Sequence, residues 1–248
     1  MKAWHIGIGA AALIAAPVIA ATQAGPGSFA NVVADAARPA EDTVRDEDRK
    51  PAEMLAFAQV RPGIKVAEIA PGGGYFTRLL SLSAGSTGKI YAVSSRPIGW
   101  LAGWTATHPN VIQQSGQITD PLASEPVDLV WTTQNYHDFK NRPADASGKD
   151  GAALYNAAAF DALKPGGVYL IGDHAGAPGT GTTQTSTLHR IESVAVIREV
   201  EAAGFKLEAR SDILKHPADD HTSKVFDSGI RGKTDQFVLR FRKPRAKR

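Results

Sequence analysis

The sequence of 248 residues predicts a doubly wound α/β fold, with a seven-stranded, mostly parallel sheet and an antiparallel last strand. Between residues 64 and 209, short runs of strand-forming residues alternate with segments of helical periodicity, a pattern typical of parallel strands joined by helices. Three glycines directly follow the first run, at the sheet edge where such folds bind ligands. No helical segment separates the last two strands, so we expect them to pair antiparallel.

The composition is that of one globular domain. Hydrophobic residues make up 43% of the chain and charged residues 21%, which is enough to bury one substantial core. The absence of cysteine excludes disulfides, thiolate metal sites and a cysteine nucleophile. The net charge is only +3, and six of the nine residues 240–248 are basic. Because no basic groove with interleaved aromatic residues accompanies this tail, we expect a solvated end and no nucleic-acid partner.

Residues 1–24 resemble a secretory signal peptide. Lys2 precedes an apolar run over residues 6–20, and small residues such as Ala20 stand where a signal peptidase cleaves. The run is too short to span a bilayer comfortably. We therefore predict an exported protein, periplasmic or secreted, with no stable membrane insertion once the signal is removed. Because the basic region is a single lysine, an uncleaved anchor is the alternative.

The remaining chain divides into a linker or N-terminal arm over residues 25–50, a main domain over residues 51–241 and a basic tail over residues 242–248. The arm is rich in alanine, glycine, proline and alternating charge, without a clear period. Apolar residues at helical spacing in residues 51–60, with Pro51 in the first turn, predict the helix that leads into the sheet.

Each remaining element follows from a local pattern. The first strand lies within residues 64–69, after the turn signal at residues 61–63, and a helix follows the glycines. A second helix is predicted over residues 152–163, ending at the Pro-Gly-Gly turn of residues 165–167, and a third over residues 188–203, ending at Gly204. The further strands are predicted at residues 89–93, 110–114, 127–133, 168–172, 205–209 and 235–241.

Residues 68–74 place an acidic residue at the end of the first strand and a glycine-rich turn after it. This segment resembles motif I of the class I S-adenosylmethionine-dependent methyltransferases, and the seven-strand pattern and the turn at residues 163–167 resemble that family as well. The resemblance covers about residues 50 to 241. Ala70 stands where the family has its first glycine; since alanine disfavours positive φ, either this position is not left-handed or the loop is altered.

The resemblance implies S-adenosylmethionine as the cofactor, with the glycine turn at its amino-acid portion. The second strand departs from the family, because Ser94 replaces the acidic residue that binds the ribose hydroxyls; a serine hydroxyl makes a hydrogen bond without the charge that strengthens it. The cofactor-binding residues that we predict are Glu68, Gly72, Gly73, Gly74, Ser94 and Asn135.

Two histidines beside acids follow the fourth and fifth strands. His137 and Asp138 come after the fourth strand, and His174 follows Asp173 at the end of the fifth. Neighbouring parallel strands end side by side, and an imidazole titrates near neutral pH, so we predict that His137, Asp138 and His174 are catalytic, with His137 as the general base. The strand before His137 is expected beside the glycine-bearing strand. In the alternative interpretation, the histidines only cap backbone groups in loops.

The same rim raises the possibility of a divalent cation held by oxygen and nitrogen ligands from His137, Asp138, Asp173, His174, Asp220 and His221. Their spacing matches no compact metal motif, so we predict no metal. Asp219 and Asp220 are better interpreted as the start of a turn.

The sequence thus predicts a methyltransferase that uses S-adenosylmethionine and a small-molecule acceptor. One alternative is a non-catalytic small-molecule binder that retains the fold, which Ala70, Ser94 and the export signal favour because the cofactor is made in the cytoplasm. A metal-assisted enzyme at the His/Asp rim is the other alternative. Fold does not imply function, and the sequence leaves the acceptor open.

Overall fold

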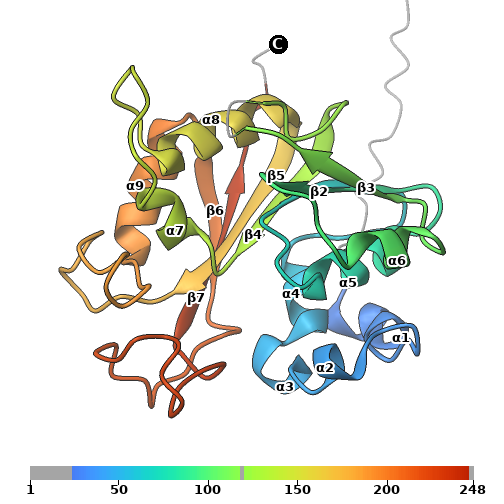
Figure 1. Ribbon diagram of the computed structural model, residues 1–248, viewed down its shortest axis with the longest axis horizontal. Coiled ribbons are helices and arrows are strands. Elements are labelled where there is room, and N and C mark those ends of the chain that lie inside the picture. The colour runs from blue at the N-terminus through green and yellow to red at the C-terminus, as the bar shows by residue number, and fades with distance from the viewer. Residues whose placement is uncertain (1–23, 118–119, 246–248) are drawn as a thin grey trace, which may run out of the picture.

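The computed structural model describes residues 24–117 and 120–245. A seven-stranded sheet with the order β3-β2-β1-β4-β5-β7-β6 forms its centre (Figure 1). β1 to β5 pair in parallel, and β7 is antiparallel to both β5 and β6, which confirms the predicted fold class. The strands are β1 (Lys65–Ile69), β2 (Lys89–Ser94), β3 (Val111–Ser115), β4 (Val127–Thr133), β5 (Leu163–His174), β6 (Lys206–Ser211) and β7 (Gln236–Arg242).

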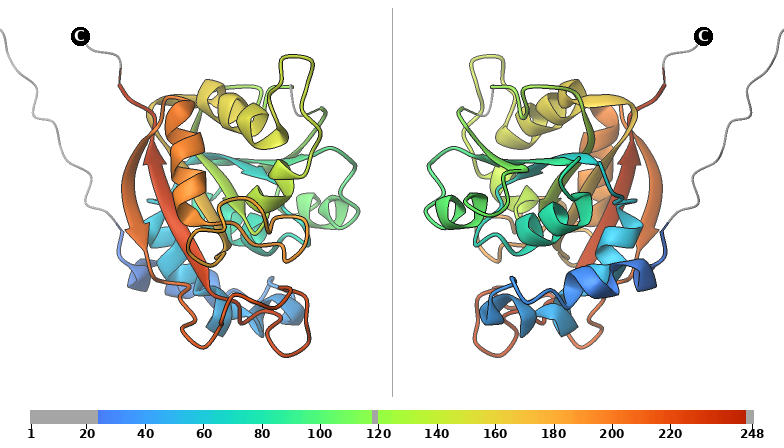
Figure 2. Two further views of the ribbon diagram at one scale, coloured as in Figure 1. Left: turned by 90° about the vertical axis from the view of Figure 1, so that its left-hand side faces the viewer. Right: turned by 90° about the vertical axis from the view of Figure 1, so that its right-hand side faces the viewer.

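Helices cover both faces of the sheet (Figure 2). One core lies between the sheet and α4 and α5, and the other lies between the sheet and α7, α8 and α9. Successive strand residues alternate between them, as Val66 and Ala67 of β1 do. The helices are η1 (Pro26–Phe29), α1 (Ala30–Val33), α2 (Ala40–Thr43), α3 (Asp46–Arg49), α4 (Pro51–Phe57), α5 (Tyr75–Ala84), α6 (Leu101–Thr105), α7 (Tyr136–Lys140), α8 (Gly151–Ala162) and α9 (Ser193–Ala202).

The strand order brings the segments that follow β1, β4 and β5 to one edge of the sheet. β4 pairs with β1 on one side and with β5 on the other, and Thr133 of β4 lies beside Gly172 of β5. The glycine turn after β1, helix α7 after β4 and His174 at the end of β5 therefore share this edge, as the sequence predicted.

Two predicted boundaries are wrong. β5 begins at Leu163 rather than Val168, because the predicted turn is taken into the sheet as an irregularity: Leu163 pairs with Val127, and Gly166 has φ +83°. The third predicted helix begins at Ser193 rather than Leu188. His189 has φ +57°, and the buried Arg190 is bonded to a separate loop, so the chain cannot be helical there.

The segment predicted as a linker or N-terminal arm contains the short helices η1, α1, α2 and α3. They lie beside the loop of residues 212–235 at the edge of the sheet that carries the glycine turn (Figures 1 and 2). At the other end of the chain, β7 includes Arg242, whose guanidinium donates to Glu208, so the first residue of the predicted solvated tail belongs to the sheet.

The predicted signal peptide, apart from Ala24, lies outside the described residues. Among the residues that are described, no helix combines the length and the apolarity needed to cross a membrane.

Candidate active site

The glycine turn has the backbone geometry of a tight strand-to-helix connection. Gly72 and Gly74 have φ of +56° and +85°, and Ala70 has φ +56°. Ala70 therefore adopts the left-handed conformation, so the first alternative, that this position is not left-handed, is wrong. A Cβ added at Gly72 or Gly73 would meet nothing within 4 Å, so the main chain at these two residues faces open space.

A small cavity of about 160 Å³ lies over the turn, between β1, β4 and the arm. The Glu68 carboxyl, which is 3% exposed, lines it and accepts a hydrogen bond from Thr77 Oγ1 at 2.5 Å. Burial raises the pKa of Glu68 to about 7, against the opposing effects of Thr77 and of Arg78. The other lining residues are Arg45, Arg49, Ala70, Pro71, Gly72, Gly73, Tyr75, Phe76, Thr133, Gln134 and Asn135.

An ion pair and a hydrogen bond to α5 fix the arm over this cavity. The buried Asp42 carboxylate accepts from Arg78 Nε of α5 at 2.7 Å. Asp46 accepts from the Arg38 guanidinium at 2.6 Å and from the Tyr75 hydroxyl, also at 2.6 Å. Because removing one partner of a buried pair leaves an uncompensated charge, these contacts hold the arm in one position.

Arg49 of the arm is the unusual charge of the site. Its guanidinium donates to Gln134 Oε1 at 2.8 Å, and within residues 24–117 and 120–245 no carboxylate lies at salt-bridge distance from it. Burial, and then the charge of Arg45, lower its pKa to about 10. Arg49 therefore remains protonated at neutral pH, as a cation aimed into a cavity without an anionic partner.

Of the other predicted cofactor residues, some line the cavity and others do not. Asn135 lines the cavity, and its side chain donates to the carbonyl oxygens of Thr133 at 2.6 Å and Ala70 at 3.2 Å. A Cβ at Gly74 would lie 2.5 Å from the Trp100 ring, which donates from Nε1 to Gly72 O at 2.8 Å. Ser94 does not line the cavity, and its hydroxyl accepts from the Arg96 amide at 3.3 Å.

A second cavity, of about 500 Å³, adjoins the first, since both are lined by Arg45, Arg49 and Gln134. Residues of the arm and of the loop of residues 212–235 line it, and these two segments lie side by side (Figure 2). The remaining lining residues are Asp48, His174, Val225, Phe226, Arg231, Gly232 and Gln236.

His137 is buried beside Asp173. Its Nδ1 lies 2.8 Å from Asp173 Oδ1, and its backbone amide donates to Asp173 Oδ2 at 2.7 Å. Burial lowers the pKa of His137, but the charge and hydrogen bond of Asp173 outweigh burial, so the pKa is raised. His137 lines neither cavity; its Nε2 lies 3.2 Å from Nδ1 of His189.

His174 has the opposite properties. It lines the second cavity, and its Nδ1 lies 2.7 Å from the Thr234 hydroxyl. Burial lowers its pKa to about 4, although the charge of Asp173 acts in the other direction. The imidazole of His174 is therefore neutral at physiological pH.

The structure brings together four of the predicted rim residues: His137, Asp138, Asp173 and His174. It separates the other two from them. Asp220 accepts from the Thr222 amide and hydroxyl in a turn, as predicted, and His221 Nε2 contacts Asp235 at 3.0 Å. Asp219 instead forms a two-bond ion pair with the buried Arg190.

Sequence reasoning missed two contributions to this edge. His189 reaches His137 from a segment that was predicted to be helical. Arg45 and Arg49 come from an arm without a clear periodic pattern. In the sequence, Arg49 is marked only by the helix start at Pro51, from which Lys50 separates it, and this gives no indication of a site.

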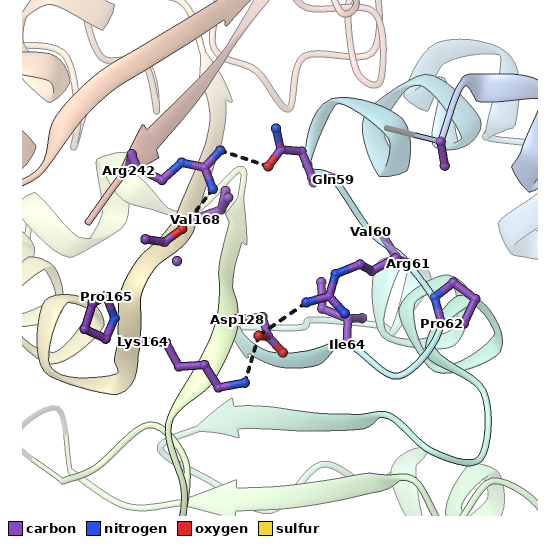
Figure 3. A pocket seen from close by; sticks show the side chains of 14 residues that line it. Gln59, Val60, Arg61, Pro62, Ile64, Asp128, Lys164, Pro165, Val168 and Arg242 are labelled. Atoms are coloured by element: carbon purple, nitrogen blue, oxygen red, sulfur yellow. Dashed lines mark hydrogen bonds and ion pairs between the residues drawn. The ribbon is translucent and has the colours of Figure 1, made fainter. Parts of the chain in front are cut away.

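A third cavity, of about 500 Å³, lies at the opposite edge of the sheet (Figure 3). Its charged groups are paired with one another or with neighbouring polar groups: Asp128 with Arg61 and Lys164, and Arg242 with Gln59. It lies at the amino ends of the strands, away from the glycine turn, and we assign no chemistry to it.

Neither a protein-family model nor a curated protein sequence matches the chain. Solved structures do. An S-adenosylmethionine-dependent methyltransferase from Aquifex aeolicus has a TM-score of 0.58 at 15% identity, over 88% of this chain and 98% of its own.

Two further structures resemble the chain. The N-methyltransferase NodS from Bradyrhizobium japonicum has a TM-score of 0.55 at 16% identity, over 82% of this chain and 96% of its own. The [4+2]-cyclase SpnF has a TM-score of 0.58 at 14% identity, over 89% and 93%; its name describes another reaction on a similar fold. With the glycine turn and the strand order, these similarities show that the chain has the fold of the class I S-adenosylmethionine-dependent methyltransferases.

Proposed function

We propose that the protein is a methyltransferase that uses S-adenosylmethionine and a small-molecule acceptor. One observation carries this proposal: a single cavity over Gly72 and Gly73 is lined by the Glu68 carboxyl and by the Arg49 guanidinium, which donates to Gln134 and has no carboxylate partner among the described residues. A carboxylate and a guanidinium complement the ammonium and the carboxylate of an α-amino acid. These two side chains therefore fit the amino-acid portion of the cofactor.

Two side chains are available to contact the nucleoside portion of the cofactor. Trp100 offers an aromatic surface beside the glycine turn, and Ser94 at the end of β2 offers one hydroxyl without charge. In this proposal Glu68 and Arg49 hold the amino-acid portion, and Gly72 and Gly73 allow its close approach. When bound, S-adenosylmethionine supplies an electrophilic methyl group on a sulfonium centre.

The second cavity is the proposed acceptor site. Its volume of about 500 Å³ falls within the range of small-molecule pockets, roughly 300 to 1,000 Å³. Arg45, Arg49 and Arg231 line it together with one acid, Asp48, and with the apolar Val225 and Phe226. We propose an acceptor with an acidic group and an apolar part, and we assign no nucleic-acid partner.

His174 is the imidazole that lines the acceptor cavity, and because it is neutral it accepts a proton without first losing one. The general-base role of His137 stays a prediction. Its Nε2 lies among His189 and Asp138 rather than at the cavity, so the geometry favours His174 as the proton acceptor.

Calorimetry with S-adenosylmethionine on residues 24–248 tests the proposal. We expect the parent to bind, and Gly73→Val to bind at least about tenfold more weakly, because its side chain occupies open space in the cavity without the strain of a positive φ. Gly25→Val is the matched control, since Gly25 is extended and equally open but lies outside both cavities.

If the parent does not bind the cofactor, the methyltransferase proposal fails. If it binds the cofactor and transfers methyl to no carboxylate-bearing compound, the non-catalytic alternative is favoured. Equal binding by Gly73→Val and the parent would show that the glycine turn is only a turn.

We also propose that residues 1–24 direct export and are then removed. The support is the apolar run followed by small residues. Mass spectrometry of the protein from its native host tests this, and an intact Met1 on a cytoplasmic product would contradict it.

A further inference from the structure

We propose that His137, Asp138 and His189 form a binding site for a divalent transition-metal ion of the zinc class. The sequence predicted no metal, because the spacing of the predicted rim residues matches no compact metal motif. The structure adds His189, and the three residues offer two imidazole nitrogens and one carboxylate oxygen within 4.8 Å of one another. Such a mixed nitrogen and oxygen set suits zinc and its neighbours.

The three atoms form a nearly equilateral triangle. His137 Nε2 lies 3.2 Å from His189 Nδ1, and Asp138 Oδ1 lies 3.4 Å from each of these nitrogens. Ligands about 2.0 to 2.2 Å from a tetrahedral zinc ion are about 3.3 to 3.6 Å apart. The triangle therefore has the size of one face of a zinc tetrahedron, so a cation would bind with little movement of the side chains.

Asp173 orients the first ligand. It is fully buried and lies 2.8 Å from Nδ1 of His137, and it also accepts from the backbone amides of His137 and His174. Because a carboxylate only accepts, Nδ1 carries the proton and the lone pair of Nε2 points to the triangle. A carboxylate behind a ligating histidine is the arrangement that fixes the ring and raises its basicity at zinc sites.

The second ligand is held by its neighbours. His189 has φ +57°, a conformation that a non-glycine residue keeps only when its surroundings impose it. Arg190, fully buried, makes two 2.9 Å bonds to Asp219 and anchors the segment, while the Phe226 ring packs 4.8 Å from the His189 ring.

The triangle is open on one side. The His137 side chain is 2% exposed, but those of His189 and Asp138 are 28% and 51% exposed. Three protein ligands with one open position are typical of catalytic zinc. Through Phe226 and His174 the site also borders the second cavity. None of the three ligands lines the cavity proposed for S-adenosylmethionine, so zinc binding does not require the cofactor.

The test is a zinc titration of chelator-stripped protein, residues 24–248, without S-adenosylmethionine. By calorimetry and by metal analysis after dialysis, we expect one zinc ion per chain. His189→Ala and Asp138→Asn should each weaken binding at least about tenfold. His216→Ala is the matched control, because His216 lies outside the cluster, and it should bind zinc as the parent does.

A hydrogen-bonded histidine pair without metal is the competing interpretation of the same contacts. The proposal is overturned if the parent retains less than one zinc ion per chain, or if His189→Ala and Asp138→Asn bind zinc as tightly as His216→Ala. Circular dichroism of the stripped variants establishes that they are folded; because both substituted side chains are partly exposed, we expect native spectra.

Discussion

His137 and His174 stand at the ends of two neighbouring strands, with ring centroids 5.8 Å apart, yet their pKa values shift in opposite directions. Burial lowers both. Asp173 bonds the ring of His137 but only the backbone amide of His174, whose ring contacts the neutral Thr234. The charges of His137, Arg190 and Arg49 lower the pKa of His174 further. A buried carboxylate thus sustains the charge of the one imidazole that it bonds directly.

The substitution Asp173→Asn should have the largest effect on the difference between the two histidines. The substitution removes the charge opposite His137 and weakens a buried network that accepts from two amides and one ring. We expect a loss of about 3 to 5 kcal/mol of unfolding free energy, as when a buried pair loses one partner. Urea denaturation measures it. Asp220→Asn, an exposed turn residue, should show no comparable loss; equal effects would contradict a structural role for Asp173.

The acid dependence of stability is the next effect. The pKa of His174 is lowered from 6.5 to about 4, so the unfolded chain binds a proton more readily than the folded one. The contribution of neutral His174 to the unfolding free energy is therefore fully present above pH 6.5. It is lost as the pH falls towards 4, and the loss is on the order of 3 kcal/mol.

His174→Gln should flatten this part of the curve of unfolding free energy against pH. Urea denaturation at several pH values measures it. The metal-free His137→Gln variant serves as the comparison, because the pKa of His137 is raised. That raised pKa contributes stability below pH 6.5, which is lost at higher pH. The same acid-side slope in parent and His174→Gln would show that another group is responsible.

The comparison also predicts unequal catalytic effects. With an acceptor found by screening small carboxylic acids, His174→Ala should lower turnover by about a hundredfold, near the lower limit for general-base catalysis because its basicity is weak. The affinity for S-adenosylmethionine should stay unchanged. If His137→Ala lowers turnover more than His174→Ala does, and if this loss is the same with and without added zinc, His137 is the general base instead.

The smallest effect concerns Asp138. It is a lesser cause of the raised pKa of His137 than Asp173 is, and its side chain is half exposed. Asp138→Asn in metal-free protein should therefore lower the pKa of His137 less than Asp173→Asn does, because solvent screens an exposed charge. Titration of the imidazole signals by NMR measures both variants. A decrease as large as that of Asp173→Asn would contradict the assignment of Asp173 as the main partner.

Local sequence patterns were enough to predict the sheet and the edge where the candidate site lies. Strand patterns, glycine turns and the order of elements are local signals, and parallel pairing then requires His137 and His174 to end side by side. The glycine turn after Glu68 was predictable for the same reason, since glycine reports directly on backbone conformation.

Which side chains contact one another could be seen only in the tertiary structure. Arg49 reaches the glycine turn from an arm that is separated from it in sequence, and His189 approaches His137 because Arg190 is bonded to Asp219 in a later loop. The opposite pKa shifts of His137 and His174 arise because Asp173 bonds the ring of His137, whereas the ring of His174 bonds Thr234. Such contacts depend on burial and on the packing of segments distant in sequence, which local patterns do not encode.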